Sequence, residues 1–411
     1  MSELNDLTKR HDRHIESVDW LSDAVLPAAI TLTEVLEPSE GKSAIIFPPT
    51  FAVRNAPHPY QIDVLNPNIP PQTAKPEEEV NNCLIDSVGS QANRMEPCFK
   101  TSPLSELVPQ IEVELRTASK DGETNVKVNL LEIGHRIADG AVRFSDLRDD
   151  VTAAIEAMKA DANAEKLAKL APTSLVFGFW DSRPDTTMFK YGRLLSSTIR
   201  ATNVAVVKRS AQFSPAFDPS LIGLGDEVPE VGEPTQTAEQ EAGKAGDGKD
   251  PLSKLGLRAA PAVNTHGGVR VFGQIVRRTQ ISLVALRSLA VTKKTSDGGG
   301  LEIDKEATLK LRRYVLGLAL VAARCQAHYA LREGCLLVRS GEPESKLVYT
   351  DGKRDEFEWD LEQVWEYAKA AANKFGVGES PKRFSFSAQR ANEEVKKLKA
   401  DKSAKKRKSS S

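Results

Sequence analysis

The chain has 411 residues, 40% of them apolar, and a formal net charge of −1. That length can bury a substantial core and allows two or three domains. No run of eighteen apolar residues is present, and the polar start, MSELNDLTKRHDRH, lacks the apolar stretch of a secretory signal, so we expect a cytoplasmic protein that does not enter a membrane.

The first half of the chain predicts two kinds of element. Residues 28–36 have the β-rich composition of a strand, and residues 83–96 resemble a short helix that is reached through Asp86 or Ser87 and ends before Pro97. The segments 111–115 and 126–133 alternate around a turn at 120–122, which predicts a β-hairpin. A helix is expected from about residue 136 to residue 160.

The second half continues the mixture of strands and helices. The expected strands are 174–180 (SLVFGFW), 203–208, 268–281, 335–340 and 346–350, and the expected helices are 283–289 and 304–332. Because hairpins accompany the helices, the sequence predicts an α+β fold with a largely antiparallel sheet.

Low-complexity stretches divide the chain into a core and its additions. Residues 20–215 and 263–350 are expected to form one core together, interrupted by a mobile, acidic, Gly/Pro-rich insertion at 216–262. A helical region at 351–395 and a basic tail at 396–411 follow. The tail can bind phosphates nonspecifically, and a purely solubilising role is equally compatible with its composition.

Charge is segregated along the chain despite the near-zero total. Residues 183–209 hold six basic residues and one acid, and residues 254–287 hold six basic residues and no acid, whereas residues 226–250 hold eight acids and two lysines. If the two basic blocks meet in space they form a face that attracts phosphate. The alternative is that these arginines are ion-pair partners on unrelated faces.

The sharpest local motif is a polar stripe. At about 100° per residue, His135, Arg136, Asp139 and Arg143 would share one side of a helix. Asp139 could then hold both arginines toward a phosphate. The competing interpretation is an ion-pair cluster that only orients the helix.

Two further clusters follow strands. The first is Trp180–Arg183 with Arg193 and Arg200, which could contact a sugar-phosphate chain, whereas Phe177 and Phe179 are better explained as core. In the second, Gly267 and Gly268 permit a close backbone approach before a strand that carries Arg270 and Arg277. That pattern fits a phosphate-contacting turn or an ordinary tight turn.

The sequence carries no recognised catalytic or metal signature. It lacks the GxSxG, HExxH, Rossmann and kinase motifs, and its six histidines do not cluster. The four cysteines show no CxxC pair, which favours reduced structural thiols. We therefore expect neither an enzyme nor a cofactor or metal site.

The order of these blocks resembles a known family. IDSVGSQANRME at 85–96, the His135 stripe, LVFGFWDS, the Arg193–Arg200 segment and GGVRVFGQIVRRTQISLVALRSL follow one another as in the Cas-seven superfamily protein of type I-G (formerly I-U) CRISPR systems, a RAMP protein. The resemblance covers roughly residues 28–340.

The resemblance implies a fold and a function. The fold would be a modified RRM-like, ferredoxin-type core with long insertions. Copies of the chain would assemble along the guide RNA (crRNA) in a Cascade complex with other subunits and leave the bases free for target DNA. The insertion at 216–262 would lie near a thumb that folds over the RNA, although its acidic side chains would repel the phosphates in a direct contact. The candidate RNA contacts are Arg94, Arg136, Arg143, Arg183, Arg193, Arg200, Arg270 and Arg277, supported by His135, Asp139, Gly267 and Gly268.

Two other functions remain open at this point. One is a standalone RNA-processing ribonuclease with a histidine site centred on His135 or His266. The other is an assembly protein without RNA affinity, whose arginines form ion pairs between subunits.

Overall fold

The structure is a computed structural model. It describes residues 26–51, 58–75, 77–119, 122–181, 188–213, 260–296, 299–325, 329–377 and 382–409. Most of the predicted insertion at 216–262 therefore lies outside the described residues, as does Arg183.

A nine-stranded sheet forms the centre of the molecule. Its central strands follow one another in space as β17, β1, β12, β9 and β4, and each neighbouring pair is antiparallel. The strands of this sheet are β1 (Pro27–Pro38), β3 (Ile62–Val64), β4 (Asn81–Asp86), β9 (Leu195–Thr202), β12 (Ile275–Ser282), β15 (Tyr329–Arg332), β16 (Cys335–Arg339), β17 (Glu344–Tyr349) and β18 (Arg354–Glu356).

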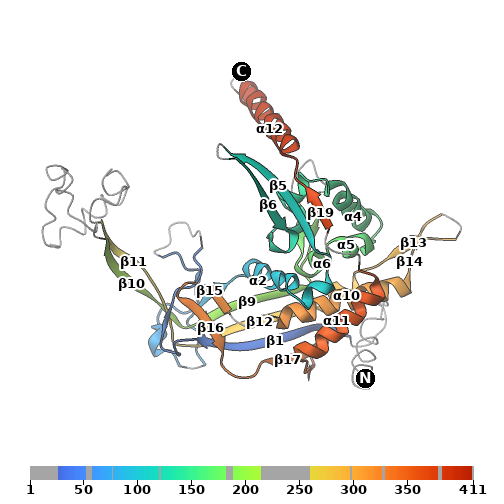
Figure 1. Cartoon of the computed structure of the whole chain (residues 1–411). Helices are drawn as coiled ribbons and strands as arrows, with labels where there is room; N and C mark the ends of the chain where they lie inside the picture. The colour runs from blue at the N-terminus through green and yellow to red at the C-terminus, as the bar shows by residue number, and fades with distance from the viewer. Residues whose placement is uncertain are drawn as a thin grey trace.

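Helices lie on one side of this sheet. Figure 1 shows α2 (Val88–Met95), α10 (Lys305–Arg324) and α11 (Leu361–Phe375) together on the same side of β1, β9 and β12. From Tyr314 to Ala323 every residue of α10 is buried, as expected for a helix that is apolar on all sides. Asp304 caps this helix by accepting a hydrogen bond from the Ala307 amide. Together with the sheet, these helices enclose the main core.

The remaining helical pieces pack beside that core. They are α3 (Gly140–Arg143), α4 (Arg148–Ala160), α5 (Glu165–Leu170), α6 (Thr173–Phe177), α9 (Leu283–Arg287) and the 3-10 turns η1 (Pro71–Thr73), η2 (Glu96–Lys100), η3 (Leu104–Leu107), η4 (Leu130–Glu132) and η5 (Arg136–Ala138).

Several ribbons and one helix extend from the body. They are β10 (Val204–Phe213) with β11 (Ala260–Val271) and the short β2 (Ile45–Ile46); β5 (Ile111–Ser119) with β6 (Gly122–Asn129) and β19 (Lys382–Ser385); β13 (Thr292–Lys294) with β14 (Leu301–Ile303); β7 (Phe179–Trp180) with β8 (Lys190–Tyr191); and α12 (Ala388–Ser409). In Figure 1 the β10–β11 ribbon and α12 leave the body in different directions. Residues 396–409 of the predicted basic tail belong to α12.

The predicted α+β class with an antiparallel sheet is confirmed. The first strand, the hairpin at 111–129 and the strands near residues 335 and 346 lie where the sequence placed them. Within the described part of the chain, no helix is long and apolar enough to cross a membrane.

Five predicted elements are wrong in type or extent. The helix expected at 83–96 starts later than residue 83, because residues 81–86 are strand β4, and its cap is Ser87, one of the two residues that the sequence indicated. The segment 174–180 is helix α6 followed by the two-residue strand β7, because Gly178 ends the helix at a φ of +73°. Residues 268–281 form two strands that belong to different sheets, and the predicted helix 304–332 ends at Arg324. The fifth is the helix expected at 136–160, which the structure interrupts at Asp139.

Candidate nucleic-acid interface

The side of the nine-stranded sheet opposite the helices presents polar side chains. Along β12, Arg277 is fully buried on the helix side, and its neighbour Arg278 is exposed on the other side, because successive strand residues point to opposite faces. Arg278 pairs with Thr33 on β1 and with Thr198 on β9. We call this side the open face; Figure 1 draws no labelled helix over it.

Hydroxyl, amide and guanidinium groups dominate the open face. Away from the strand ends, its partly or fully exposed members on the three central strands are Thr31, Thr33, Val35, Ser196, Thr198, Arg200, Arg278 and Gln280. None of these eight side chains is aromatic. The face can therefore donate hydrogen bonds and offer positive charge, but these positions supply no aromatic ring on which a nucleobase could stack.

A hollow of about 450 Å³ lies at one end of the open face. Arg200 and Arg278 line it together with Lys75 and the acidic run Glu77–Glu79. The Arg200 guanidinium lies 3.2 Å from Asp63 Oδ2 and 3.0 Å from Asn82 Oδ1, and 36% of its side chain is exposed. Cations and acids are thus interleaved at this end of the face.

A second hollow of about 350 Å³ lies on the other side of residues 272–274. Arg270, Lys42 and Phe272 line it, and the Arg270 guanidinium sits 5.2 Å from the Phe272 ring centroid. Gly273 separates the two hollows. A Cβ there would lie 2.3 Å from Thr202 Oγ1, so the corner between β11 and β12 needs a glycine.

Gly267 and Gly268 do not form the predicted phosphate-contacting turn. Both are buried within strand β11, and Gly268 has a φ of +94°. A Cβ on Gly268 would meet Ile46 O at 2.5 Å, so the glycine serves the close approach of β2. Their role is structural, because backbone atoms already occupy the space that a phosphate would need.

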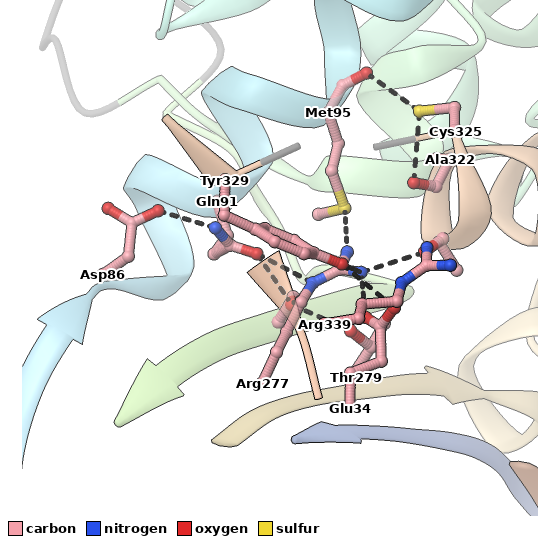
Figure 2. A network of polar contacts seen from close by, with 12 residues as sticks. Glu34, Asp86, Gln91, Met95, Arg277, Thr279, Ala322, Cys325, Tyr329 and Arg339 are labelled. Atoms are coloured by element: carbon pink, nitrogen blue, oxygen red, sulfur yellow. Dashed lines mark hydrogen bonds and ion pairs between the residues drawn. The ribbon is translucent and has the colours of Figure 1, made fainter. Parts of the chain in front are cut away.

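Arg277 is the centre of a buried polar network (Figure 2). Its guanidinium lies 2.5 Å from Glu34 Oε2 and donates to Gln91 Oε1 at 3.0 Å. Tyr329 donates to the other oxygen of Glu34 at 2.9 Å, and Arg339 lies 2.8 Å from the same atom. Through its contacts, Arg277 holds four strands and α2 together. Because Arg277 is 0% exposed, it does not present its charge to an RNA.

The polar stripe at 135–143 does not lie on one helix. Residues 136–138 form the 3-10 turn η5, and α3 starts afresh after Asp139, whose carboxylate accepts a hydrogen bond from the Ala141 amide at 2.9 Å. The preference of Asp139 for a cap and the adjacent Gly140 explain the break. His135 is exposed and lies 3.5 Å from Asp139.

Arg136 is buried in an ion pair. Its Nε lies 2.7 Å from Glu96 Oε2, its Nη1 donates to Gly178 O at 3.2 Å, and its guanidinium stacks on Phe177. Burial lowers the pKa of Arg136 and raises the pKa of Glu96 to about 7, with their mutual attraction opposing both shifts. Arg136 is thus in an ion pair, but its partner is Glu96 and not Asp139 of the stripe, and RNA cannot reach its charge.

Two other candidates are committed to the protein's own atoms. Arg94 lies 3.1 Å from Asp86 and donates to Leu331 O at 2.8 Å, which fixes α2 to β15. Arg143 is 14% exposed at its side chain, lies 3.9 Å from Glu394 of α12 and stacks on Phe144. Neither presents a freely accessible guanidinium.

The structure therefore brings together only part of the predicted set. Arg200 and Arg270 line the two hollows beside residues 272–274, and Arg278, which the sequence analysis did not select, joins them. Arg193 is exposed but lies near Arg136, away from both hollows. Sequence alone could not separate Arg277 from Arg278; the partner that identifies the buried one is Glu34, 243 residues away.

The chemistry of the described residues does not build a metal site. Among the parts of the chain that the structure describes, no group of three or more His, Cys, Asp or Glu side chains could hold an ion. The four cysteines are free, and burial raises the pKa of both Cys83 and Cys335 to about 12, which keeps these thiols protonated.

Comparison with known proteins supports a CRISPR connection. Residues 30–206 match the model of a family described as CRISPR-associated protein GSU0053. This range contains β1, β4 and β9 of the central sheet but ends before β12. A search of curated proteins found no match.

Proposed function

We propose that this CRISPR-associated protein binds the sugar-phosphate chain of a guide RNA on its open face, as the repeating backbone subunit of a Cascade effector complex. The observation that carries the proposal is that Arg200 and Arg278 line one hollow, and Arg270 the neighbouring one, beside a hydroxyl-rich sheet surface. Partners would be the crRNA, the target DNA, further copies of the chain and other Cascade subunits.

The strand order supports a modified RRM-like core. The chain visits β1, then β9 and β12, then β17, and these lie in space as β17-β1-β12-β9 with antiparallel neighbours. Helical segments, α10 among them, connect β1 to β9 and β12 to β17. This is the order of a β-α-β-β-α-β, ferredoxin-like unit, with β4 added at the edge and the β10–β11 ribbon inserted between the middle strands.

The side chains of the open face suit the backbone of the RNA more than its bases. Arginines pair with phosphate oxygens, and threonine and serine hydroxyls can bond phosphate or the 2′-hydroxyl. Since the eight central positions lack an aromatic ring, bases would remain unstacked by these strands and available for pairing. To bind phosphates, Arg200 and Arg278 would have to exchange their acidic neighbours, Glu77–Glu79 and Asp63, for phosphate oxygens.

We further propose that binding leaves the RNA intact. His135 is exposed with Asp139 as its neighbour, and a ribonuclease built on it would need a second proton-transfer group in reach of the same phosphate. The side chain of His266 lies outside the described residues. Loss of RNA cleavage after a single histidine substitution would favour the ribonuclease instead.

The experiment is coexpression of the chain with a guide RNA, followed by size exclusion and measurement of the 260/280 nm absorbance ratio with and without ribonuclease. A large species with a high ratio that shrinks after ribonuclease treatment is expected. A monomer with a protein-like ratio despite guide coexpression would contradict the proposal, and a large species that ribonuclease leaves unchanged would favour an assembly protein without RNA affinity.

A further inference from the structure

The β7–β8 ribbon exposes an aromatic side chain outside the open face. Trp180 is 65% exposed, and its strand partner Lys190 places its Nζ 5.6 Å from the indole centroid. Met188, which precedes β8 by two residues, is 62% exposed. Both are among the most exposed of the large apolar side chains that the structure describes.

The opposite side of the ribbon is firmly anchored. Phe179 is buried, and its ring lies 5.9 Å from the Phe189 ring and 6.2 Å from the Tyr191 ring. Burial raises the pKa of Tyr191 to about 12. Because alternate residues of a strand face opposite ways, this aromatic packing holds Trp180 and Lys190 outward.

The start of the ribbon is fixed as well. Gly178 has a φ of +73°, and a Cβ there would lie 2.9 Å from Tyr191 O. The buried Arg136 donates to Gly178 O at 3.2 Å, and the stem of exposed Arg193 packs against the same glycine. The backbone that carries Trp180 is therefore fixed before any ligand arrives, which lowers the entropy cost of binding.

The local charge is suited to a phosphate. Lys190 and Arg193 are exposed, whereas Asp181 is 8% exposed and its amide donates to Phe189 O within the ribbon. An exposed indole with the Lys190 ammonium over it combines a stacking surface with phosphate attraction, and exposed Arg193 lies beside Gly178 at the start of the same ribbon. Lys190 covers part of one ring face, and the large exposed fraction of Trp180 leaves room for a base beside it.

We propose that Trp180, Lys190 and Arg193 form a nucleotide-binding site for single-stranded nucleic acid, with one base stacked on Trp180 and its phosphate neutralised by the two cations. The inference extends the proposed function, since it takes the same class of ligand, but it uses residues that the open face does not contain. It assigns base stacking to a place where the sheet strands offer none.

The test is a titration of the full chain with a single-stranded eight-nucleotide oligouridylate, followed by tryptophan fluorescence. The native chain is expected to show quenching, and Trp180→Phe to lose it. Trp180→Ala should weaken binding about 5- to 150-fold, which corresponds to about 1–3 kcal/mol for one stacked base. Trp365→Phe, which changes a tryptophan on α11, should keep the quenching.

Two outcomes would overturn the site: quenching that persists in Trp180→Phe, or unchanged affinity in Trp180→Ala. Dissociation of an oligomer by Trp180→Ala without a change in oligonucleotide affinity would also overturn it and mark a protein interface. Arg200→Ala/Arg278→Ala separates the two proposals, because it should lose guide RNA while its oligouridylate quenching persists. Guide binding by the native chain without quenching would reject this site alone.

Discussion

At the scale of single residues, burial decides what each arginine does. Arg277 and Arg278 are neighbours in sequence, yet one is fully buried against Glu34 and the other faces solvent. A buried ion pair is costly to break because the remaining charge loses its partner in a low-dielectric surrounding. The pair of neighbours therefore offers a matched comparison.

Arg277→Met should lower the free energy of unfolding by about 3–5 kcal/mol, because Glu34 and Gln91 lose their central donor. Arg278→Met should change it by less than about 0.5 kcal/mol, since an exposed side chain is replaced. Urea denaturation of both variants at one pH measures the difference. Equal stability of the two variants would show that the network does not hold the sheet.

Glu96 gives a pH-dependent prediction. Its folded pKa of about 7 lies above the ordinary value of 4.5, so the protonated carboxyl favours the folded state. This contribution is fully present below about pH 4.5 and is lost as the pH rises through about 7. The stability of Glu96→Gln relative to the native chain should therefore increase between pH 5 and 8, by at most about 1.4 kcal/mol per pH unit.

Denaturation of both chains at several pH values measures this shift. Glu132→Gln, which alters a half-exposed acid, serves as the control and should show little pH-dependent difference. A constant difference between Glu96→Gln and the native chain would mean that Arg136 keeps Glu96 ionised throughout the range.

At the scale of elements, the sequence predicts best where periodicity and turn residues agree. The hairpin at 111–129 and strand β1 show such agreement. The segment SLVFGFW lacks this agreement. All five residues of α6 are buried, and a short apolar run that is buried on all sides shows no periodicity that would distinguish a helix from a strand. The helix at 136–160 fails because Asp139 and Gly140 start a new element.

The candidate site was less accessible to prediction than the fold. The sequence located the basic blocks at residues 183–209 and 254–287 but not which of their arginines point outward. That distinction depends on buried partners such as Glu34 and Glu96, which lie far from Arg277 and Arg136 along the chain. The sequence grouped Trp180 with Arg193 but placed Trp180 at the end of a longer strand, whereas the structure puts it on the two-residue strand β7, opposite Lys190.

The contact between β11 and β2 yields a prediction about glycine. Gly268→Ala should destabilise the fold by more than Gly41→Ala does. Both positions have a positive φ, but only at Gly268 would the added methyl carbon meet backbone atoms, since it would lie 2.5 Å from Ile46 O. Strain alone costs about 1–3 kcal/mol, and the clash adds to it. Thermal or urea unfolding measures both variants, and an equal loss would argue that β2 moves away freely.

At the scale of the whole molecule, near-neutral net charge conceals separate charged surfaces. The chain carries 56 basic and 57 acidic residues, and Arg200 and Arg278 line one hollow together with three glutamates, whereas Arg270 lines the neighbouring hollow. A protein that binds a long polyanion needs local positive charge and not a positive total. The proposed role therefore does not conflict with the composition.

The most direct test of the open face is the salt dependence of guide-RNA binding. The logarithm of the association constant should fall linearly with the logarithm of salt concentration, with a slope of about −0.7 for each phosphate neutralised on a single strand. Arg200→Ala/Arg278→Ala should weaken binding and reduce the steepness by about 1.4, for two lost phosphate contacts. Lys374→Ala/Arg383→Ala, which removes two exposed cations on α11 and β19, should leave the slope unchanged. A flat salt response of the native chain, or the same slope in all three proteins, would contradict the account.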